Sequence, residues 1–164
     1  MTQPSPAALA DSIDPDRLAP VPEDPTVADV MRDEVVFCLP STPIDAVAKL
    51  MADNDLVEIP VLLDRRPVGF VAAGDIVDRL IDGDVVVTGS DFAMRPPVTK
   101  VLASDLMRTP LVLVDEAQRL TEVVPAMRGQ GRHLMLVMHD DERPVGMVTA
   151  REIADFLLAR AAHG

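Results

Sequence analysis

The sequence has a single cysteine, Cys38, and contains neither tryptophan nor tyrosine. One thiol excludes an internal disulfide framework and a multi-cysteine zinc site. Proteins that bind single-stranded nucleic acids stack bases on exposed aromatic rings, but this chain has only four phenylalanines, most of them inside apolar runs. No block of basic residues offsets the net charge of −12, which repels phosphate backbones. We therefore expect no nucleic-acid partner.

Long apolar runs and the features of a signal peptide are also missing. No run approaches the roughly 18–20 residues that cross a bilayer, and Met1–Ala10 has neither a basic start nor an apolar centre. We expect a cytoplasmic protein with no membrane partner. Apolar residues make up 48% of the 164 positions, enough to build the core of one domain or of two small ones.

The chain does contain an internal repeat. Ala28–Arg32 is similar to Ser104–Arg108, about 76 residues further on, and Arg66–Gly69 recurs unchanged as Arg143–Gly146. Apolar positions between and beyond these segments match in the same order. Two copies of so long a unit indicate the duplication of a small domain rather than a solenoid.

The repeat divides the chain into four parts. Residues 1–25 are expected to form a flexible, acidic, proline-rich leader, and residues 82–102 a connector with a short edge strand near 85–87. Between and after them lie the first unit, residues 26–81, and the second unit, residues 103–162. Each unit predicts the order β-α-β-β-α after a short opening turn or helix.

Specific elements follow from apolar periodicity and from helix-start residues. In the first unit, Ser41 or Thr42 is expected to cap a helix whose first residue is Pro43. In the second unit, Pro125 predicts that the matching helix is bent or starts late. The expected strands are 35–38, 59–63, 68–72, 111–114, 134–138 and 145–149, and the expected closing helices are 75–81 and 152–162.

Three kinds of segment carry a family resemblance. An opening V-x-D-V-M stands at Val27–Met31, a P-V pair stands at Pro60 and Val61, and a G-h-h-[TS]-x-x-D motif, with h for apolar, corresponds to Gly69–Asp75 and Gly146–Glu152. These segments resemble the cystathionine β-synthase (CBS) domain, whose tandem pair is called a Bateman module. The resemblance extends over about residues 27–162.

The resemblance implies an α+β (α/β) fold in which two β-α-β-β-α CBS units pack with pseudo-two-fold symmetry. It also implies a homodimer that binds an adenosyl ligand in clefts between the units. The ligands of this class are AMP, ADP, ATP, NAD and S-adenosylmethionine. Members of the family are typically sensors. An unidentified protein partner is therefore expected to respond to the conformational change that the ligand causes.

The resemblance also places ligand contacts at the ends of the repeated motifs. The family's ribose-binding acid falls on Asp75 in the first unit and on Glu152 in the second. The preceding hydroxyl position is Ala72 in one and Thr149 in the other, so each motif departs from the family pattern. Arg151 stands where a basic residue often meets phosphate. The second unit is therefore favoured as the binding site.

The adenine region of the family falls on Leu56–Pro60 and on Arg132–Leu136. Asp55 stands at the usual glycine of the first unit, whereas the second unit keeps Gly131. The candidate contacts in these stretches are Val57, Glu58, Arg132 and His133.

Structural explanations exist for the same residues. Thr149 and Glu152 match a capping box, which satisfies the first amides of a helix without any ligand. Pure capping, and capping combined with a ribose contact, both remain open. Asp75 can equally be an acid of a first helical turn, and Arg151 an exposed helix residue.

No catalytic constellation is present. Cys38 lies in an apolar strand and is expected to be a buried, inert thiol. His133 and His139 are too far apart along an extended strand to share a metal. We expect no enzyme activity, no metal and no required cofactor. Two functions remain: a sensor that binds an adenosyl ligand, or a nucleotide-free dimerising scaffold or regulatory subunit with degenerate sites.

Overall fold

The computed structural model describes residues 24–81, 101–140 and 143–162. Most of the expected leader and the strand expected near 85–87 lie outside these residues. The elements of the first unit are α2 (Val27–Val30), α3 (Ile44–Asp53), β1 (Glu58–Leu63), β2 (Arg66–Ala72) and α4 (Ala73–Ile81). Those of the second unit are α5 (Ala103–Leu106), β3 (Val112–Asp115), α6 (Leu120–Gly129), β4 (Leu134–His139), β5 (Arg143–Thr149) and α7 (Ala150–Ala161).

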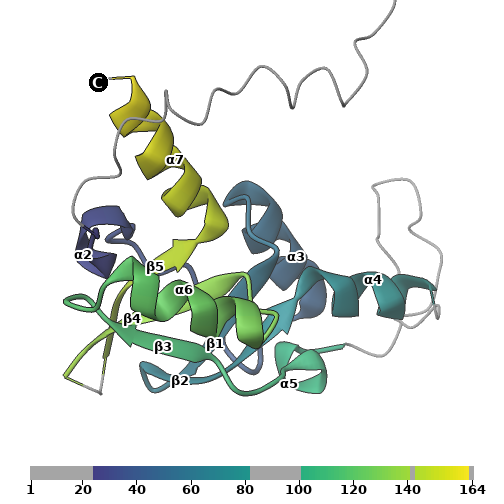
Figure 1. Cartoon of the computed structure of the whole chain (residues 1–164). Coiled ribbons are helices and arrows are strands. Elements are labelled where there is room, and N and C mark those ends of the chain that lie inside the picture. The colour runs from purple at the N-terminus through teal and green to yellow at the C-terminus, as the bar shows by residue number, and fades with distance from the viewer. Residues whose placement is uncertain (1–23, 82–100, 141–142, 163–164) are drawn as a thin grey trace, which may run out of the picture.

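The structure is a mixed α/β fold with two small sheets, as the sequence predicts (Figure 1). In the first sheet β1 pairs antiparallel with β2, and in the second β4 pairs antiparallel with β5. Both hairpins shift register at matching places, after Val61 and after Val137. The repeat seen in the sequence is therefore a repeat of backbone geometry.

The two units differ in their first strand. In the second unit β3 pairs in parallel with β4, but in the first unit the strand expected at 35–38 is reduced to one bridge between Cys38 and Val61. Cys38 donates its N–H to the carbonyl of Pro60 at 3.0 Å. Pro60 has no N–H to continue the ladder, whereas Leu136 stands at this place in β4. The expected strand is thus confirmed only in the second unit.

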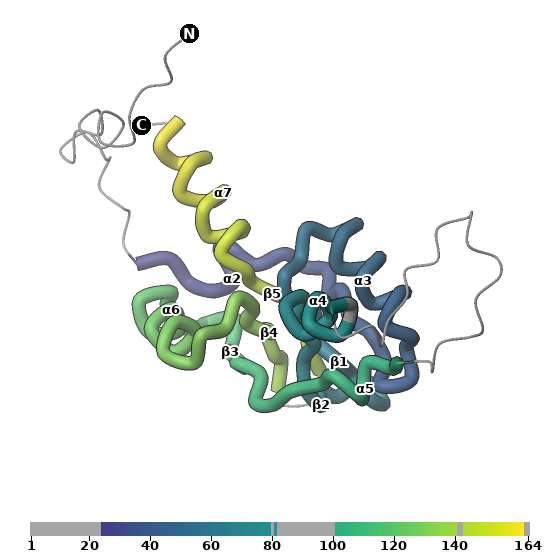
Figure 2. Tube along the Cα trace, turned by 90° about the vertical axis from the view of Figure 1, so that its right-hand side faces the viewer, coloured from purple at the N-terminus to yellow at the C-terminus, as the bar shows by residue number. Residues whose placement is uncertain are grey.

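Each unit sends its opening segment into the other unit (Figure 2). Val27 and Val30 of α2 are buried in the core of the second unit, and Ala103 and Leu106 of α5 are buried in a cluster formed mainly by the first. Beyond these helices, Arg32 forms a backbone bridge to β5 of the second unit, and Arg108 forms one to β2 of the first. This exchange holds the two units together around a pseudo-two-fold axis.

The glycine of the repeated tetrapeptide is explained by this crossing. A Cβ atom at Gly69 would lie 2.7 Å from the carbonyl oxygen of Arg108, and one at Gly146 would lie 2.6 Å from that of Arg32. Real Cβ atoms do not approach backbone so closely, so both positions require glycine.

Two helix starts can be compared with expectation. Pro43 is the N-cap of α3 and not its first residue, while the Thr42 hydroxyl accepts a hydrogen bond from the Leu39 amide at 2.9 Å. In the second unit α6 contains Pro125 but does not start late. Its first amide, at Leu120, donates to the Pro25 carbonyl at 2.9 Å, which holds the start of the helix in place.

The last helix is the least embedded element. No residue of α7 is fully buried, and the helix extends away from the sheets in both views (Figure 1, Figure 2). Within the described part of the chain, no helix is long and apolar enough to cross a membrane.

Candidate functional site

A cavity of about 560 Å³ lies between the two units. One wall comes from the starts of β1 and α4 and from β2, and the other comes from the segments that precede β3 and β4. The lining residues are Val57, Glu58, Phe70, Ala72, Ala73, Gly74, Arg108, Gly131, Arg132 and His133.

Asp75 lies in the first turn of α4, directly after Gly74 of the cavity wall. Its Oδ1 accepts a charge-assisted hydrogen bond from Nη2 of Arg108, which crosses over from the second unit. Its Oδ2 is buried and has no hydrogen-bond partner among the described residues. Buried carboxylate oxygens are nearly always hydrogen-bonded, so this atom is an acceptor in need of a donor.

A second carboxylate forms part of the cavity wall. The side chain of Glu58 is 5% exposed, and its Oε2 accepts the backbone N–H of His133 at 2.9 Å. Nη1 of Arg132 lies 3.8 Å from the other oxygen of Glu58, and the Arg132 guanidinium lies 4.1 Å above the centre of the Phe70 ring. The acids of this cavity thus come from the first unit and the arginines from the second.

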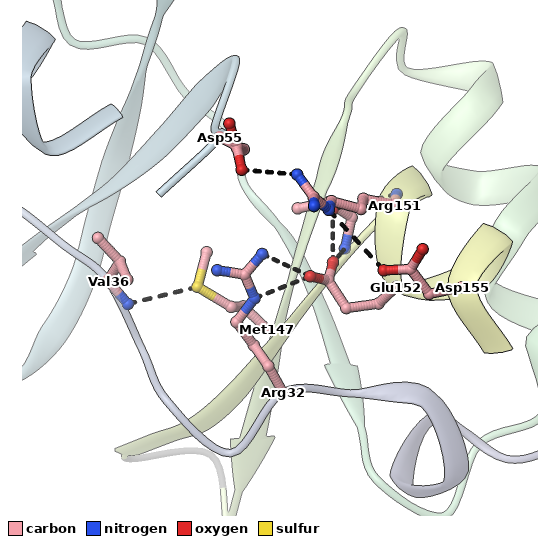
Figure 3. A network of polar contacts seen from close by, with 8 residues as sticks. Arg32, Val36, Asp55, Met147, Arg151, Glu152 and Asp155 are labelled. Carbon is pink, nitrogen blue, oxygen red and sulfur yellow. Dashed lines mark hydrogen bonds and ion pairs between the residues drawn. The ribbon is translucent and has the colours of Figure 1, made fainter. Parts of the chain in front are cut away.

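The matching acid of the second unit is Glu152, and both of its carboxylate oxygens accept hydrogen bonds (Figure 3). Its Oε1 accepts from Nε of Arg32 at 2.9 Å and also from Nη2 of that residue. Its Oε2 accepts the backbone N–H of Thr149 at 2.7 Å and contacts the Thr149 hydroxyl. Thr149 caps α7, so the capping box expected from the sequence is present.

These contacts set the ionisation of Glu152. Burial alone would raise the pKa of this carboxyl, but the hydrogen bonds from Thr149 and Arg32 outweigh burial and hold the pKa below its ordinary value. Glu152 is therefore a carboxylate at neutral pH, and donor groups of the protein itself occupy both of its oxygens.

Arg151, the neighbour of Glu152 in the chain, forms ion pairs with two aspartates. Nη1 of Arg151 lies 2.6 Å from Oδ2 of Asp55, and Nε of Arg151 lies 3.8 Å from Asp155 (Figure 3). Arg151 and Asp55 come from different units and are both more than half exposed.

The structure separates the candidate residues into two groups. Around the cavity it brings together Val57, Glu58, Arg132 and His133, with Asp75 next to the wall. On the other side of the unit–unit contact it groups Thr149, Arg151 and Glu152. Sequence reasoning missed Arg32 and Arg108, although both end the repeated opening segment and so stood at matched positions.

Other reactive groups are inert or dispersed. Burial raises the pKa of the Cys38 thiol to about 11, which keeps it protonated and a poor nucleophile at neutral pH. Among the described residues, no three histidine, cysteine, aspartate or glutamate side chains cluster as they would around a metal ion.

Comparison with known proteins gives consistent results for both units. The CBS domain family model matches residues 27–82 and 103–159. The chain is 21% identical over 149 residues to the uncharacterized protein MJ1225 of Methanocaldococcus jannaschii, and the alignment covers 91% of this chain and 50% of MJ1225. The chain thus spans about half the length of that relative.

Two of the solved structures with the same fold contain adenosyl compounds. The CBS domain pair of protein MJ0100, in complex with 5′-methylthioadenosine and S-adenosyl-L-methionine, superposes with a TM-score of 0.67 at 17% identity, covering 84% of this chain and 99% of that chain. CBSX2 in complex with AMP superposes with a TM-score of 0.62 at 20% identity, covering 83% and 98% respectively.

Proposed function

The chain belongs to the CBS domain family, with one domain in each half, and from this premise we propose that it is a non-catalytic regulatory module that binds an adenosyl ligand. The binding site in this proposal is the cavity beside Asp75. The ligand class comprises AMP, ADP, ATP, NAD and S-adenosylmethionine, and the related pairs with 5′-methylthioadenosine, S-adenosyl-L-methionine and AMP support it.

The buried, unpartnered Oδ2 of Asp75 carries the proposal. A ribose diol supplies hydroxyl donors, and a hydroxyl placed at this atom would satisfy it without disturbing the pair between Oδ1 and Arg108. The adjacent cavity of about 560 Å³ falls in the size range of small-molecule sites.

The other lining residues suit the rest of such a ligand. Val57, which is 56% exposed, offers apolar surface to a base, and Arg108, whose side chain is 58% exposed, offers a cation to a phosphate. Asp75 and Glu58 already face Arg108 and Arg132, so the cavity has little net charge. A monophosphate such as AMP fits this balance better than ATP does.

This placement departs from the preference for the second unit that the sequence alone suggests. The departure rests on the difference between two carboxylates: Glu152 has donors at both oxygens, whereas Asp75 has a donor at only one. In this proposal Thr149, Arg151 and Glu152 hold the two units together.

The output of the module would be a population shift. The cavity walls come from both units, so a ligand that contacts both favours the arrangement in which the walls fit it best. An unidentified protein partner would read that arrangement.

A thermal-shift screen against AMP, ADP, ATP, NAD and S-adenosylmethionine tests the proposal. A ligand at 100 times its dissociation constant stabilises the folded state by about 2.7 kcal/mol. The shift should disappear in Asp75→Asn and persist in Glu152→Gln, which is the matched control from the other unit. A folded, nucleotide-free protein that shows no shift with any of the five ligands would contradict the proposal.

A nucleotide-free dimerising scaffold is the second candidate, and the exposed apolar residues of the closing helices favour it. Ile81 at the end of α4 is 77% exposed and Leu158 of α7 is 68% exposed. A second copy of the chain would cover such residues. Sedimentation of the wild type and of Leu158→Glu tests this: a dimer that becomes a monomer in the variant, together with a blank ligand screen, would favour the scaffold.

A further inference from the structure

The two sides of the unit–unit contact use matching positions of the repeat but different side chains. Asp75 matches Glu152, and Arg108 matches Arg32, so each unit's acid pairs with the arginine of the other unit. The two acids differ in how many of their carboxylate oxygens accept a hydrogen bond. Glu152 has protein donors at both oxygens, whereas Oδ2 of Asp75 is buried with none among the described residues.

The walls differ in the same sense. On the Asp75 side, Gly74 and Gly131 both line the cavity. Their matches on the other side are Arg151 and Asp55, whose side chains meet at 2.6 Å and bridge the two walls (Figure 3). The ion pair thus occupies the two positions at which the Asp75 side has glycines.

The backbone conformation is similar at one of these matched positions. Asp55 has a φ of 54° and Gly131 a φ of 62°, both in the left-handed region that favours glycine. Aspartate tolerates this region better than most residues do, and at this position it forms the ion pair with Arg151.

We propose that the module holds one adenosyl ligand per chain, in the Asp75 cavity, and that Asp55 and Arg151 close the pseudo-symmetric cleft on the other side. The proposal rests on the proposed function and deepens it by assigning the stoichiometry. Asp55 and Arg151 are then the residues that determine how many ligands the pair of units accepts.

Titration calorimetry of the full chain with AMP and with S-adenosylmethionine measures the stoichiometry directly. The expected value is one ligand per chain for whichever probe binds. The same value is expected for Glu152→Gln, because that residue lies on the closed side.

The closing pair can also be transferred to the open side. In the variant Gly74→Arg with Gly131→Asp, a Cβ at either position meets no atom within 4 Å. Gly131 has a φ of 62°, which strains aspartate and the asparagine of the control alike. We expect affinity to fall at least about 100-fold. The control, Gly74→Ala with Gly131→Asn, adds side chains that cannot form the ion pair, and should bind within about threefold of the wild type.

The outcomes separate this inference from the proposed function. Two ligands per chain would overturn the inference and leave the function standing. One ligand whose binding survives both the transferred pair and Asp75→Asn would overturn the inference and the placement of the site beside Asp75, and would leave only an adenosyl-binding module whose site lies elsewhere. If none of AMP, ADP, ATP, NAD and S-adenosylmethionine binds, the function falls and the inference with it. If circular dichroism shows that the transferred pair unfolds the chain, Asp75→Asn alone decides between the two sides.

Discussion

Asp75 and Glu152 stand at matching positions in the first turns of α4 and α7, yet only Glu152 has hydrogen-bond donors at both carboxylate oxygens. A duplicated unit has thus produced two environments for one position. In the second unit the carboxylate of Glu152 joins the start of α7 to Arg32 of the first unit. In the first unit Oδ2 of Asp75 has no donor among the described residues, and Asp75 directly follows Gly74 of the cavity wall. In the proposed function a ligand hydroxyl supplies the missing donor.

Removing Arg32 should destabilise the protein. Its side chain and that of Glu152 are only 24% and 13% exposed, so Arg32→Ala leaves a largely buried carboxylate without its charged donor. The expected loss is about 1–3 kcal/mol in the free energy of unfolding, measured by urea denaturation. Lys49→Ala is the control because it breaks an exposed pair with Asp53, and it should cost less than about 1 kcal/mol. Equal losses would contradict the assignment.

The stability of the chain should also depend on the ionisation of Glu152. Its pKa in the folded state is lowered, so its contribution is present above the ordinary glutamate pKa of about 4.3 and is lost as pH falls through the lower folded value. Between about pH 5 and pH 3, the unfolding free energy of the wild type should fall more steeply than that of Glu152→Gln. Parallel pH profiles would show that the group is not coupled to folding.

The crossing of the units should tolerate no side chain at its glycines. Gly146→Ala places a Cβ 2.6 Å from the Arg32 carbonyl and should cost about 1–3 kcal/mol, because backbone must move. Gly129→Ala, at the end of α6, meets no atom within 4 Å and should be neutral or slightly stabilising. Thermal unfolding of the two variants checks this contrast, and a neutral Gly146→Ala would refute the close approach.

Arg108 should distinguish phosphorylated from unphosphorylated ligands. In the proposed site its exposed guanidinium meets a phosphate, so Arg108→Ala should weaken AMP binding by about tenfold or more. Adenosine has no phosphate, and its affinity should change by less than about threefold. Calorimetry with both compounds makes the comparison. An equal loss for AMP and adenosine would mean that Arg108 acts only by positioning Asp75.

Much of the fold follows from local sequence signals. The hairpins β1–β2 and β4–β5 and the closing helices come from apolar periodicity, and their limits agree with expectation to within two or three residues. The matched segments ending at Arg32 and Arg108 revealed the duplication. Local signals failed where a single proline changed the outcome, as at Pro60, which removes a hydrogen bond from the first strand of the first unit.

The candidate site was less accessible from sequence, because it depends on how the units pack. The pairs Arg32–Glu152 and Arg108–Asp75 join residues far apart in the chain, and no local sequence pattern predicts them. Motif comparison ranked the second unit higher for its hydroxyl at Thr149. The structure shows that hydroxyl capping α7, a use that the motif alone could not separate from ligand binding.

A crystal structure of the chain grown with AMP or S-adenosylmethionine, whichever gives the larger thermal shift, tests the central claim most directly. The account predicts one ligand in the cavity between Gly74 and Gly131, with a ribose hydroxyl within hydrogen-bond distance of Asp75 Oδ2. A ligand bound instead beside Glu152, with the pair between Arg151 and Asp55 broken, would contradict it.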